Sequence, residues 1–186
     1  MNVYDFDGTI YRGDSSVDFY VYCLVRFPWL GLLLPYQLLM IVAYHIGLCS
    51  KEKEKSAFFS FLRWIPDYSR AVENFWKKNI NSIAPWYLEQ QKDDDVIISA
   101  SPYFLLKPVC KKIGIHYLIA SIVNPKNGSF ESKNCYGQEK VLRFYTCFPH
   151  ASINEFYSDS KSDKALAVIA KKAYFVKKGL YITKWI

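Results

Sequence analysis

The sequence lacks the paired cysteines that staple a small domain or hold a zinc ion. Its five cysteines show no short paired spacing, which predicts neither a zinc knuckle nor a redox dithiol and fits a reducing compartment. Acidic residues are also scarce, because 17 Asp and Glu face 24 Lys and Arg, for a formal net charge of +7. That balance favours an anionic partner: a phosphate ester, a lipid head group or nucleic acid. The cysteines are Cys23, Cys49, Cys110, Cys135 and Cys147.

Two further absences narrow the class of protein. The sequence has no basic helix with base-reading residues, no aromatic pattern of the RNP type and no zinc finger, so nucleic acid is not predicted as a partner. Residues 1–7 are too short and too acidic for a signal peptide, which predicts a cytoplasmic protein.

A chain of 186 residues is long enough for one buried core that carries a sizeable insertion. Short apolar segments typical of strands alternate with helical segments, except that residues 14–91 have helical patterns throughout. This order predicts an α/β fold, a Rossmann-like core with a parallel sheet and an inserted helical cap after the first strand. The predicted domains are a catalytic core of residues 1–13 and 92–186 and a cap of residues 14–91.

The individual elements are predicted from apolar periodicity and from capping residues. Ser101 and Pro102 predict one helix start, with Ser101 as the N-cap and Pro102 as the first helical residue. The other predicted helices are residues 14–26, 50–64, 68–82, 85–91, 138–146 and 165–172. The predicted strands are residues 2–6, 96–100, 117–123 and 153–157, with a terminal strand or hairpin at 174–176 and 180–183.

Polar side chains stand at the ends of predicted strands and at the start of one helix. Asp5 and Asp7 leave the first strand, where Gly8 permits a sharp turn. Ser99 ends the second strand, and Lys140 opens a helix. Because ligands of open α/β sheets bind at the carboxyl ends of the strands, we expect these side chains to meet in one crevice.

A second acid pair, Asp159 and Asp163, lies where the fourth strand turns into a helix. Carboxylate oxygens are the ligands that Mg²⁺ prefers. Each cluster alone has an ordinary explanation, as an acidic turn, a helix cap or a solvated lysine. Their joint occurrence in one order along the chain is far more specific. The first acid pair, Asp5 and Asp7, suits phosphoryl transfer, in which one carboxylate attacks phosphorus and the other acid protonates the leaving group.

These four motifs cover most of the chain and resemble those of haloacid dehalogenase superfamily phosphatases, in the branch similar to phosphoserine phosphatase. The resemblance implies a Mg²⁺-dependent phosphomonoester hydrolase that works through an aspartyl-phosphate. It makes Asp5 the nucleophile and Asp7 the general acid and base. Ser158 departs from the pattern, because many members have Gly before the metal-binding acid. The implied site residues are Asp5 and Asp7 for catalysis, Thr9, Ser99, Ala100 and Lys140 for phosphate, Asp14 for substrate at the mouth of the cap, and Asp5, Asp7 (through its carbonyl), Asp159 and Asp163 for the metal.

Residues 27–48 contain no Asp, Glu, Lys or Arg, and the run is comparable with the roughly 20 apolar residues of a membrane span. A single crossing there would separate Asp5 from Ser99 by a bilayer, so the site could not assemble. The sequence therefore predicts two short helices broken near Pro35. They either pack inside a soluble cap or dip into a membrane surface, with Arg26 and the lysines of residues 51–55 beside them.

This stretch also resembles the phosphatidylglycerophosphatase C type of the same superfamily. The likeness implies a lipid phosphate such as phosphatidylglycerophosphate as substrate, peripheral membrane contact through the apolar cap, and a location at the inner face of the membrane. Two alternatives stay open. One is a soluble phosphatase that binds a small phosphoserine-like substrate under a closed cap, and the other is a non-catalytic binding module of the same fold.

Overall fold

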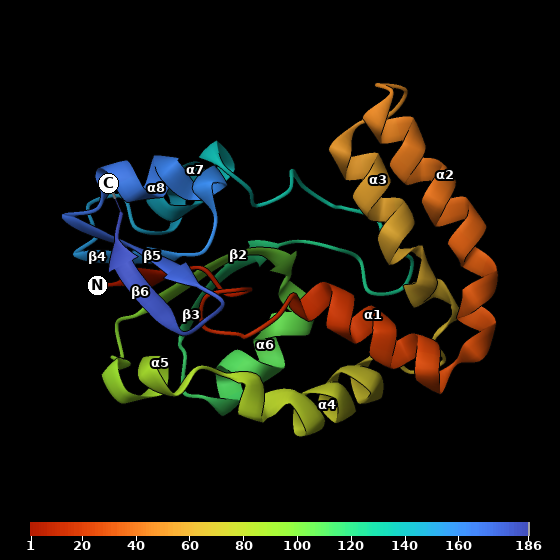
Figure 1. Ribbon diagram of the computed structural model, residues 1–186, viewed down its shortest axis with the longest axis horizontal. Coiled ribbons are helices and arrows are strands. Elements are labelled where there is room, and N and C mark those ends of the chain that lie inside the picture. Colours follow the sequence, from red (N-terminus) through yellow and green to blue (C-terminus); the bar gives the residue numbers. More distant parts are fainter. Residues whose placement is uncertain (186) are drawn as a thin grey trace.

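The computed structural model, which describes residues 1–185, is built on one six-stranded sheet (Figure 1). The strand order is β3-β2-β1-β4-β5-β6, and all neighbours pair in parallel except the antiparallel pair of β5 and β6. This arrangement confirms the predicted α/β fold and the terminal hairpin. The strands are β1 Val3–Tyr4, β2 Val96–Pro102, β3 Tyr117–Ser121, β4 Glu155–Ser158, β5 Lys172–Lys177 and β6 Tyr181–Lys184.

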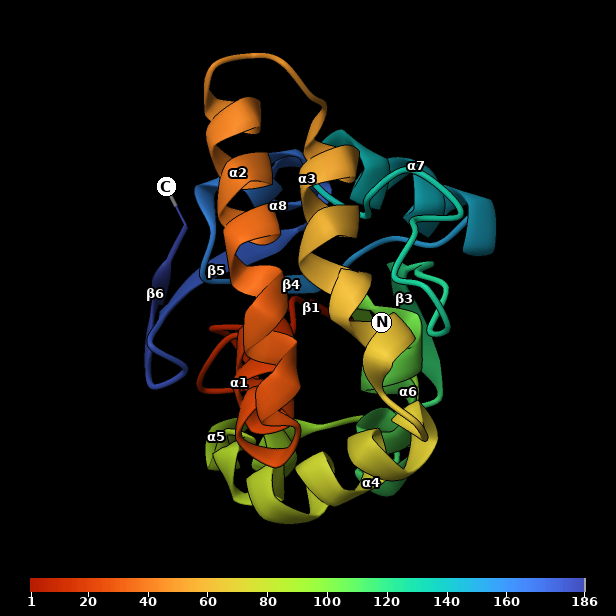
Figure 2. The ribbon, with the colours of Figure 1, turned by 90° about the vertical axis from the view of Figure 1, so that its right-hand side faces the viewer.

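Helices cover both faces of the sheet and extend beyond its carboxyl end. In Figure 1, α7 and α8 lie on one face, α4, α5 and α6 lie on the other, and α1, α2 and α3 project past the end of β2. Figure 2 shows α2 and α3 side by side at that end. The α-helices are α1 Ser15–Arg26, α2 Leu34–His45, α3 Lys51–Phe58, α4 Tyr68–Asn79, α5 Pro85–Gln90, α6 Tyr103–Lys112, α7 Gln138–Cys147 and α8 Lys164–Ile169. The 3-10 helices are η1 Pro28–Leu33, η2 Phe59–Trp64, η3 Ile80–Ser82 and η4 Lys161–Asp163.

Local sequence explains where the helices of the insertion begin. Asp14, Ser50 and Asp67 cap α1, α3 and α4, because a side-chain oxygen of each accepts a hydrogen bond from a backbone N–H of the first turn. Pro85 occupies the first position of α5, where the missing N–H costs nothing. The strands β1 and β2 are almost entirely buried, as expected of parallel strands that are covered on both faces.

The predicted start of α6 is wrong. Strand β2 continues to Pro102, and α6 begins at Tyr103 without a side-chain cap. The pairing of β2 with β3 shifts register between Ser99 and Pro102. Ser101 therefore belongs to the strand, and its hydroxyl donates to Asp7 and does not cap α6. The predicted helix of residues 50–64 changes to a 3-10 helix at Phe59, and that of residues 165–172 ends at Ile169 before β5.

The helical insertion and the sheet share one apolar core. Trp76 of α4 packs edge-on against Phe6 and Tyr11, and its Nε1 donates a hydrogen bond of 2.7 Å to the carbonyl oxygen of Leu105. The loop between β3 and α7 also reaches the insertion, because the backbone at Gly128 lies against that of Phe59. The division of the chain into a core and a cap domain stays a prediction.

No single helix within residues 1–185 is long and apolar enough to cross a bilayer. One bent pair, Ser15–Arg26 with Pro28–His45, passes the same test of length and composition when its two parts are taken together. The chain bends by 120° between the two parts.

The shared core generates a prediction for the two tryptophans of the insertion. Trp76 is 2% exposed and Trp64 is 56% exposed. Trp76→Ala is expected to lower the free energy of unfolding by about 3–5 kcal/mol, because it leaves a cavity between α4 and the sheet. Trp64→Ala is the matched control and is expected to stay within about 0.5 kcal/mol of the unmodified protein. Urea denaturation measures both, and equal losses would contradict a core shared by insertion and sheet.

Candidate active site

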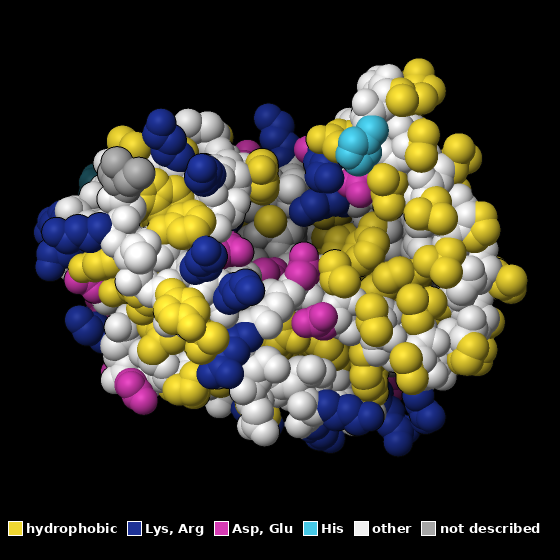
Figure 3. Space-filling view, in the orientation of Figure 1, with side chains coloured by type: hydrophobic (Ala, Val, Ile, Leu, Met, Phe, Trp, Pro, Cys, Tyr) yellow, Lys and Arg dark blue, Asp and Glu magenta, His cyan; other side chains and the backbone are white. Residues whose placement is uncertain are grey.

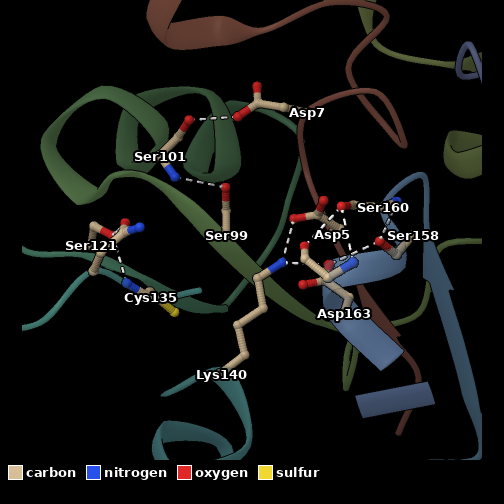
Figure 4. Close-up of polar contacts among 12 residues, drawn as sticks. Asp5, Asp7, Ser99, Ser101, Ser121, Cys135, Lys140, Ser158, Ser160 and Asp163 are labelled. Atoms are coloured by element: carbon tan, nitrogen blue, oxygen red, sulfur yellow. Dashed lines mark hydrogen bonds and ion pairs between the residues drawn. The ribbon is translucent and has the colours of Figure 1, made fainter. Parts of the chain in front are cut away.

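The first acid pair lies on the loop that follows β1. The backbone N–H of Asp5 donates to the carbonyl oxygen of Tyr157 at 2.9 Å, which fixes the loop to β4. Gly8 has a positive φ of 68°, and its N–H donates to the carbonyl oxygen of Gly13 at 2.9 Å. This turn lets Asp5 and Asp7 make contacts with different parts of the molecule (Figure 4).

Lys140 holds two of the predicted acids together. Its Nζ lies 2.8 Å from Asp5 Oδ1 and 2.7 Å from Asp163 Oδ2 (Figure 4). The side chain is 2% exposed, so water screens these ion pairs very little. One ammonium on α7 thus joins the loop after β1 to the segment after β4.

Asp7 is held by the start of α1 and by the end of β2. Its Oδ1 accepts a 2.7 Å hydrogen bond from the backbone N–H of Ser15, and its Oδ2 accepts a bond from the hydroxyl of Ser101. The Ser101 hydroxyl also contacts those of Ser15 and Ser16. The backbone N–H of Ser101 in turn donates to Ser99 Oγ at 3.1 Å. These contacts fix the carboxylate of Asp7 at the junction of core and insertion.

The second acid pair lies beyond the end of β4. Ser158 Oγ donates to Asp163 Oδ2 at 2.8 Å and accepts from the N–H of Ser160 at 3.1 Å. Asp159 packs against Gly8, where a Cβ atom would overlap its carboxylate. The absence of a side chain at Gly8 is therefore what lets Asp159 approach the loop that carries Asp5.

These groups open into one cleft of about 580 Å³. It contains every predicted site residue except Thr9, which is fully buried and whose Oγ1 has no hydrogen-bond partner within residues 1–185. Figure 3 shows a hollow between the side of the molecule that carries α7 and α8 and the side that carries α2 and α3. The predicted residues in the lining are Asp5, Asp7, Asp14, Ser99, Ala100, Lys140, Asp159 and Asp163.

Negative charge exceeds positive charge at the ion pairs. Burial, opposed by Lys140 and reinforced by Asp163, raises the pKa of Asp5 to about 7. Burial alone would lower the pKa of Lys140, but the carboxylates of Asp5 and Asp163 outweigh it and raise that pKa. The two carboxylates keep Lys140 protonated. Because one ammonium cannot neutralise two carboxylates, the three groups carry a net negative charge when both acids are ionised.

The other acids show the same imbalance. Burial, followed by the charge of Asp14, raises the pKa of Asp7 to about 6, although its hydrogen bonds from Ser101 and Ser15 oppose the shift. Burial, followed by Asp163, also raises the pKa of Asp159. A cation bound among these carboxylates would relieve the repulsion.

The residues present fit a hard divalent cation such as Mg²⁺. The available donors are carboxylate and carbonyl oxygens, the kind that Mg²⁺ binds. Asp163 Oδ1 is buried and has no hydrogen-bond partner within the described residues, which leaves one oxygen available beside the ion pair with Lys140. No three His, Cys, Asp or Glu side chains in residues 1–185 already form a metal-binding group, so a cation would require the carboxylates to adjust.

Asp14 both caps helix α1 and lines the cleft. Its Oδ1 accepts from the backbone N–H groups of Ser16 and Val17 at 3.0 Å each, which makes it the N-cap of α1. It also lines the cleft. Its predicted role in selecting substrates stays a prediction, since the capping bonds already account for an acid at this position.

Sequence reasoning missed several residues of the cleft. Ser101 was assigned to a helix cap, whereas its hydroxyl holds Asp7. Lys55 and Glu54 of α3 line the cleft, and Lys55 Nζ donates to Asn134 Oδ1 at 3.2 Å. No local pattern marks these residues, because the α3 segment alternates Lys and Glu as solvated helices do. Ser158, a departure from the family pattern, supplies the hydroxyl that binds Asp163.

The acids, the hydroxyls and the lysine lie at the carboxyl end of an open α/β sheet, where proteins of this class bind their ligands. The family model of the haloacid dehalogenase-like hydrolases matches residues 3–167, so the chain belongs to that family. No curated protein sequence matches the chain.

Solved structures share the fold at low sequence identity. A protein of unknown function from Bordetella pertussis Tohama I is 17% identical, with a TM-score of 0.75 over 93% of this chain and 87% of that one. A phosphoserine phosphohydrolase-like protein from Francisella tularensis subsp. tularensis SCHU S4 is 16% identical, with a TM-score of 0.59 over 93% and 86%. A phospho-aspartyl intermediate analogue of phosphoserine phosphatase is 14% identical, with a TM-score of 0.53 over 92% and 83%.

The raised pKa of Asp7 predicts an effect on stability. Its value rises from 3.8 to about 6 on folding, so its contribution to stability is fully present below pH 3.8 and is lost as the pH rises through about 6. Asp7→Asn removes the buried charge and is expected to raise the free energy of unfolding by up to about 3 kcal/mol at pH 8 in a chelator.

Thermal unfolding of both proteins measures this effect. The difference in Tm is expected to shrink as the pH is lowered from 8 to 5, because the native Asp7 then carries its proton. A difference in Tm that is zero at pH 8, or that does not depend on pH, would show that the buried charge of Asp7 does not destabilise the fold.

Proposed function

We propose that this protein is a phosphatase that hydrolyses a phosphomonoester through an aspartyl-phosphate on Asp5. The observation that carries the proposal is the meeting of Asp5, Asp7, Ser99 and Lys140 in one cleft. A related fold has been solved as a phospho-aspartyl intermediate analogue of phosphoserine phosphatase, which supports the same chemistry here. The presence of all these acids disfavours a binding module that has lost turnover.

The first step transfers the phosphoryl group to the protein. A carboxylate oxygen of Asp5 forms a bond to phosphorus while the bond to the ester oxygen breaks. Asp7 gives its proton to that oxygen, which leaves as the alcohol. A pKa of about 6 suits this task, because burial keeps part of the population protonated near neutral pH.

The second step restores the protein. Asp7, now a carboxylate, removes a proton from water, and the water oxygen attacks phosphorus as the bond to Asp5 breaks. Phosphate leaves and Asp5 is a carboxylate again. Lys140, whose charge is stabilised by the carboxylates of Asp5 and Asp163, offsets the negative charge that spreads over the phosphoryl oxygens in both steps.

Mg²⁺ fits the proposal as the cation that neutralises the cleft. The residues that would hold it are Asp5, Asp159, Asp163 and the backbone carbonyl of Asp7, all of which stand in or beside the cleft. Bound there, it would lower the charge felt by an incoming phosphate and favour the ionised form of Asp5.

The substrate that we favour is a lipid phosphate, and a small soluble phosphoester is the alternative. Lys51 and Lys55 of α3 also line the cleft and can meet a second anionic group. Helix α3 packs against the strongly apolar α2, which places apolar surface near the cleft. The predicted cytoplasmic location, at the inner face of a membrane, stays a prediction.

Replacement of the nucleophile tests the reaction. Asp5→Asn is expected to lower the release of phosphate from p-nitrophenyl phosphate by at least about 1,000-fold, because the amide cannot attack phosphorus. Asp93→Asn, at an exposed turn, is the matched control and is expected to retain full activity. A chelator is expected to abolish the activity, and added Mg²⁺ to restore it. Phosphate release that persists in Asp5→Asn would refute the proposed nucleophile.

The hydrogen bond from Ser101 predicts a shift in the pH profile. That bond lowers the pKa of Asp7, so Ser101→Ala raises the pKa and keeps the acid protonated to higher pH. With an alkyl phosphate, whose leaving group needs a proton, the alkaline limb of kcat/KM is expected to move upward in Ser101→Ala. With p-nitrophenyl phosphate, a better leaving group, the shift is expected to be small. A downward shift of the alkyl phosphate limb would contradict the assignment of Asp7 as the acid.

A further inference from the structure

Helix α2 has its polarity inverted relative to an ordinary surface helix. Its one buried residue is Gln37, which is 5% exposed. The side chain of Gln37 accepts a 2.5 Å hydrogen bond from the hydroxyl of Tyr20 and donates a 3.0 Å bond to the carbonyl oxygen of Phe58. An amphipathic surface helix turns its apolar side inward, whereas α2 attaches to the protein through an amide and presents its aliphatic residues outward.

The outward residues form a continuous apolar surface. Figure 3 shows apolar side chains gathered over the side of the molecule formed by α1 and α2. We name the part of this surface within residues 27–48 the apolar ridge, defined by the six aliphatic residues there that are 54% to 84% exposed. A surface of this kind marks an interaction site. The apolar ridge consists of Leu32, Leu38, Leu39, Val42, Ile46 and Leu48.

Charge and aromatic residues frame the apolar ridge as they frame membrane-bound segments. Residues 27–50 contain no Asp, Glu, Lys or Arg. Arg26 precedes this segment, and Lys51 and Lys53 follow it, all three exposed. Trp29 is half exposed beside the apolar ridge, and its Nε1 donates to the carbonyl oxygen of Trp64. Tryptophan and basic side chains are the residues that favour the boundary between lipid and water.

We propose that the apolar ridge docks into one leaflet of a bilayer that contains anionic phospholipid. No single helix within residues 1–185 is long and apolar enough to cross a bilayer. The twelve residues of α2 extend only about 18 Å at 1.5 Å per residue, compared with the roughly 30 Å hydrocarbon core. Helix α1, the other half of the bent pair, is fixed to the protein by the buried Phe19 and Cys23 and by its cap at the cleft. The segment therefore enters the membrane surface without crossing it.

A lipid surface fits the apolar ridge better than a second protein does. Leu38, Leu39, Ile41 and Val42 are all exposed, and at 3.6 residues per turn they spread over about half of the circumference of α2. A protein partner would cover a narrower side of a protruding helix, whereas lipid chains can surround all of these residues. The net charge of +7 favours an anionic bilayer.

The apolar ridge and the cleft consist of different residues, so docking and hydrolysis can be tested separately. The apolar ridge contributes none of the residues that line the cleft. Helix α3 lies between them and contacts both, because it packs on α2 and lines the cleft with Lys51 and Lys55. Docking would hold this side of the cleft close to the head groups, where a lipid phosphate is presented.

The experiment is sedimentation of the full chain with phosphatidylcholine vesicles that contain or lack phosphatidylglycerol. The test variant is Leu38→Glu with Leu39→Glu, at two sites 60% and 64% exposed, and the matched control is Val168→Glu on α8, 73% exposed. The unmodified protein and Val168→Glu are expected to pellet with the phosphatidylglycerol vesicles. The test variant is expected to bind at least about tenfold more weakly, because two charges cannot enter the hydrocarbon.

Turnover of p-nitrophenyl phosphate in solution is expected to be equal in all three proteins, which shows that the variants fold. Three outcomes would overturn the docking proposal. They are unmodified protein that stays in the supernatant, a test variant that binds as tightly as the control, and an apolar ridge that forms a dimer in solution and leaves vesicles unbound. Equal binding to pure phosphatidylcholine would overturn the anionic requirement. Absence of turnover in the unmodified protein would instead refute the proposed phosphatase and leave docking intact.

Discussion

The buried ammonium of Lys140 is the contact on which the cleft depends. It joins Asp5, at the end of the first strand, to Asp163, which lies 158 residues later in the chain. A charge buried without partners would cost several kcal/mol, so the fold can bury Lys140 only if both acids arrive. Burial, together with the charge of Asp163, raises the pKa of Asp5. The negative charge left in excess when both acids are ionised makes the cleft receptive to a cation.

A second network ties the helical insertion to this centre. Ser101 of β2 and Ser15 of α1 both donate to Asp7, so the carboxylate that we propose as acid and base sits where sheet and insertion meet. Movement of α1 would therefore change the contacts of Asp7 directly. On the other side of the insertion, Lys55 reaches Asn134 in the loop before α7. The sheet, the insertion and the loop before α7 are thus joined by contacts around the cleft.

Much of the fold and of the cleft could be predicted from sequence because the informative signals are local. Buried strands are short apolar runs, and the acids follow them directly, so topology alone brings Asp5, Ser99 and Asp159 to one edge. The start of α6 could not be predicted in the same way. Ser101 has the features of a helix cap, but a register shift with β3 and the nearby Asp7 give its hydroxyl a different partner. The partner of the Ser101 hydroxyl is Asp7, which lies 94 positions away in the chain, where no local pattern can indicate it.

The succession of strands along the chain, the acids at their ends and the apolar character of residues 27–48 can be predicted from the sequence, because each follows from the chemistry of adjacent residues. The direction in which that apolar segment faces depends instead on contacts between elements far apart in the chain. An apolar helix is equally compatible with a buried core position and with a lipid-facing one, and the choice depends on whether other elements cover it. Here α2 is anchored by Gln37 to Tyr20 and Phe58, which turns its aliphatic residues away from the protein.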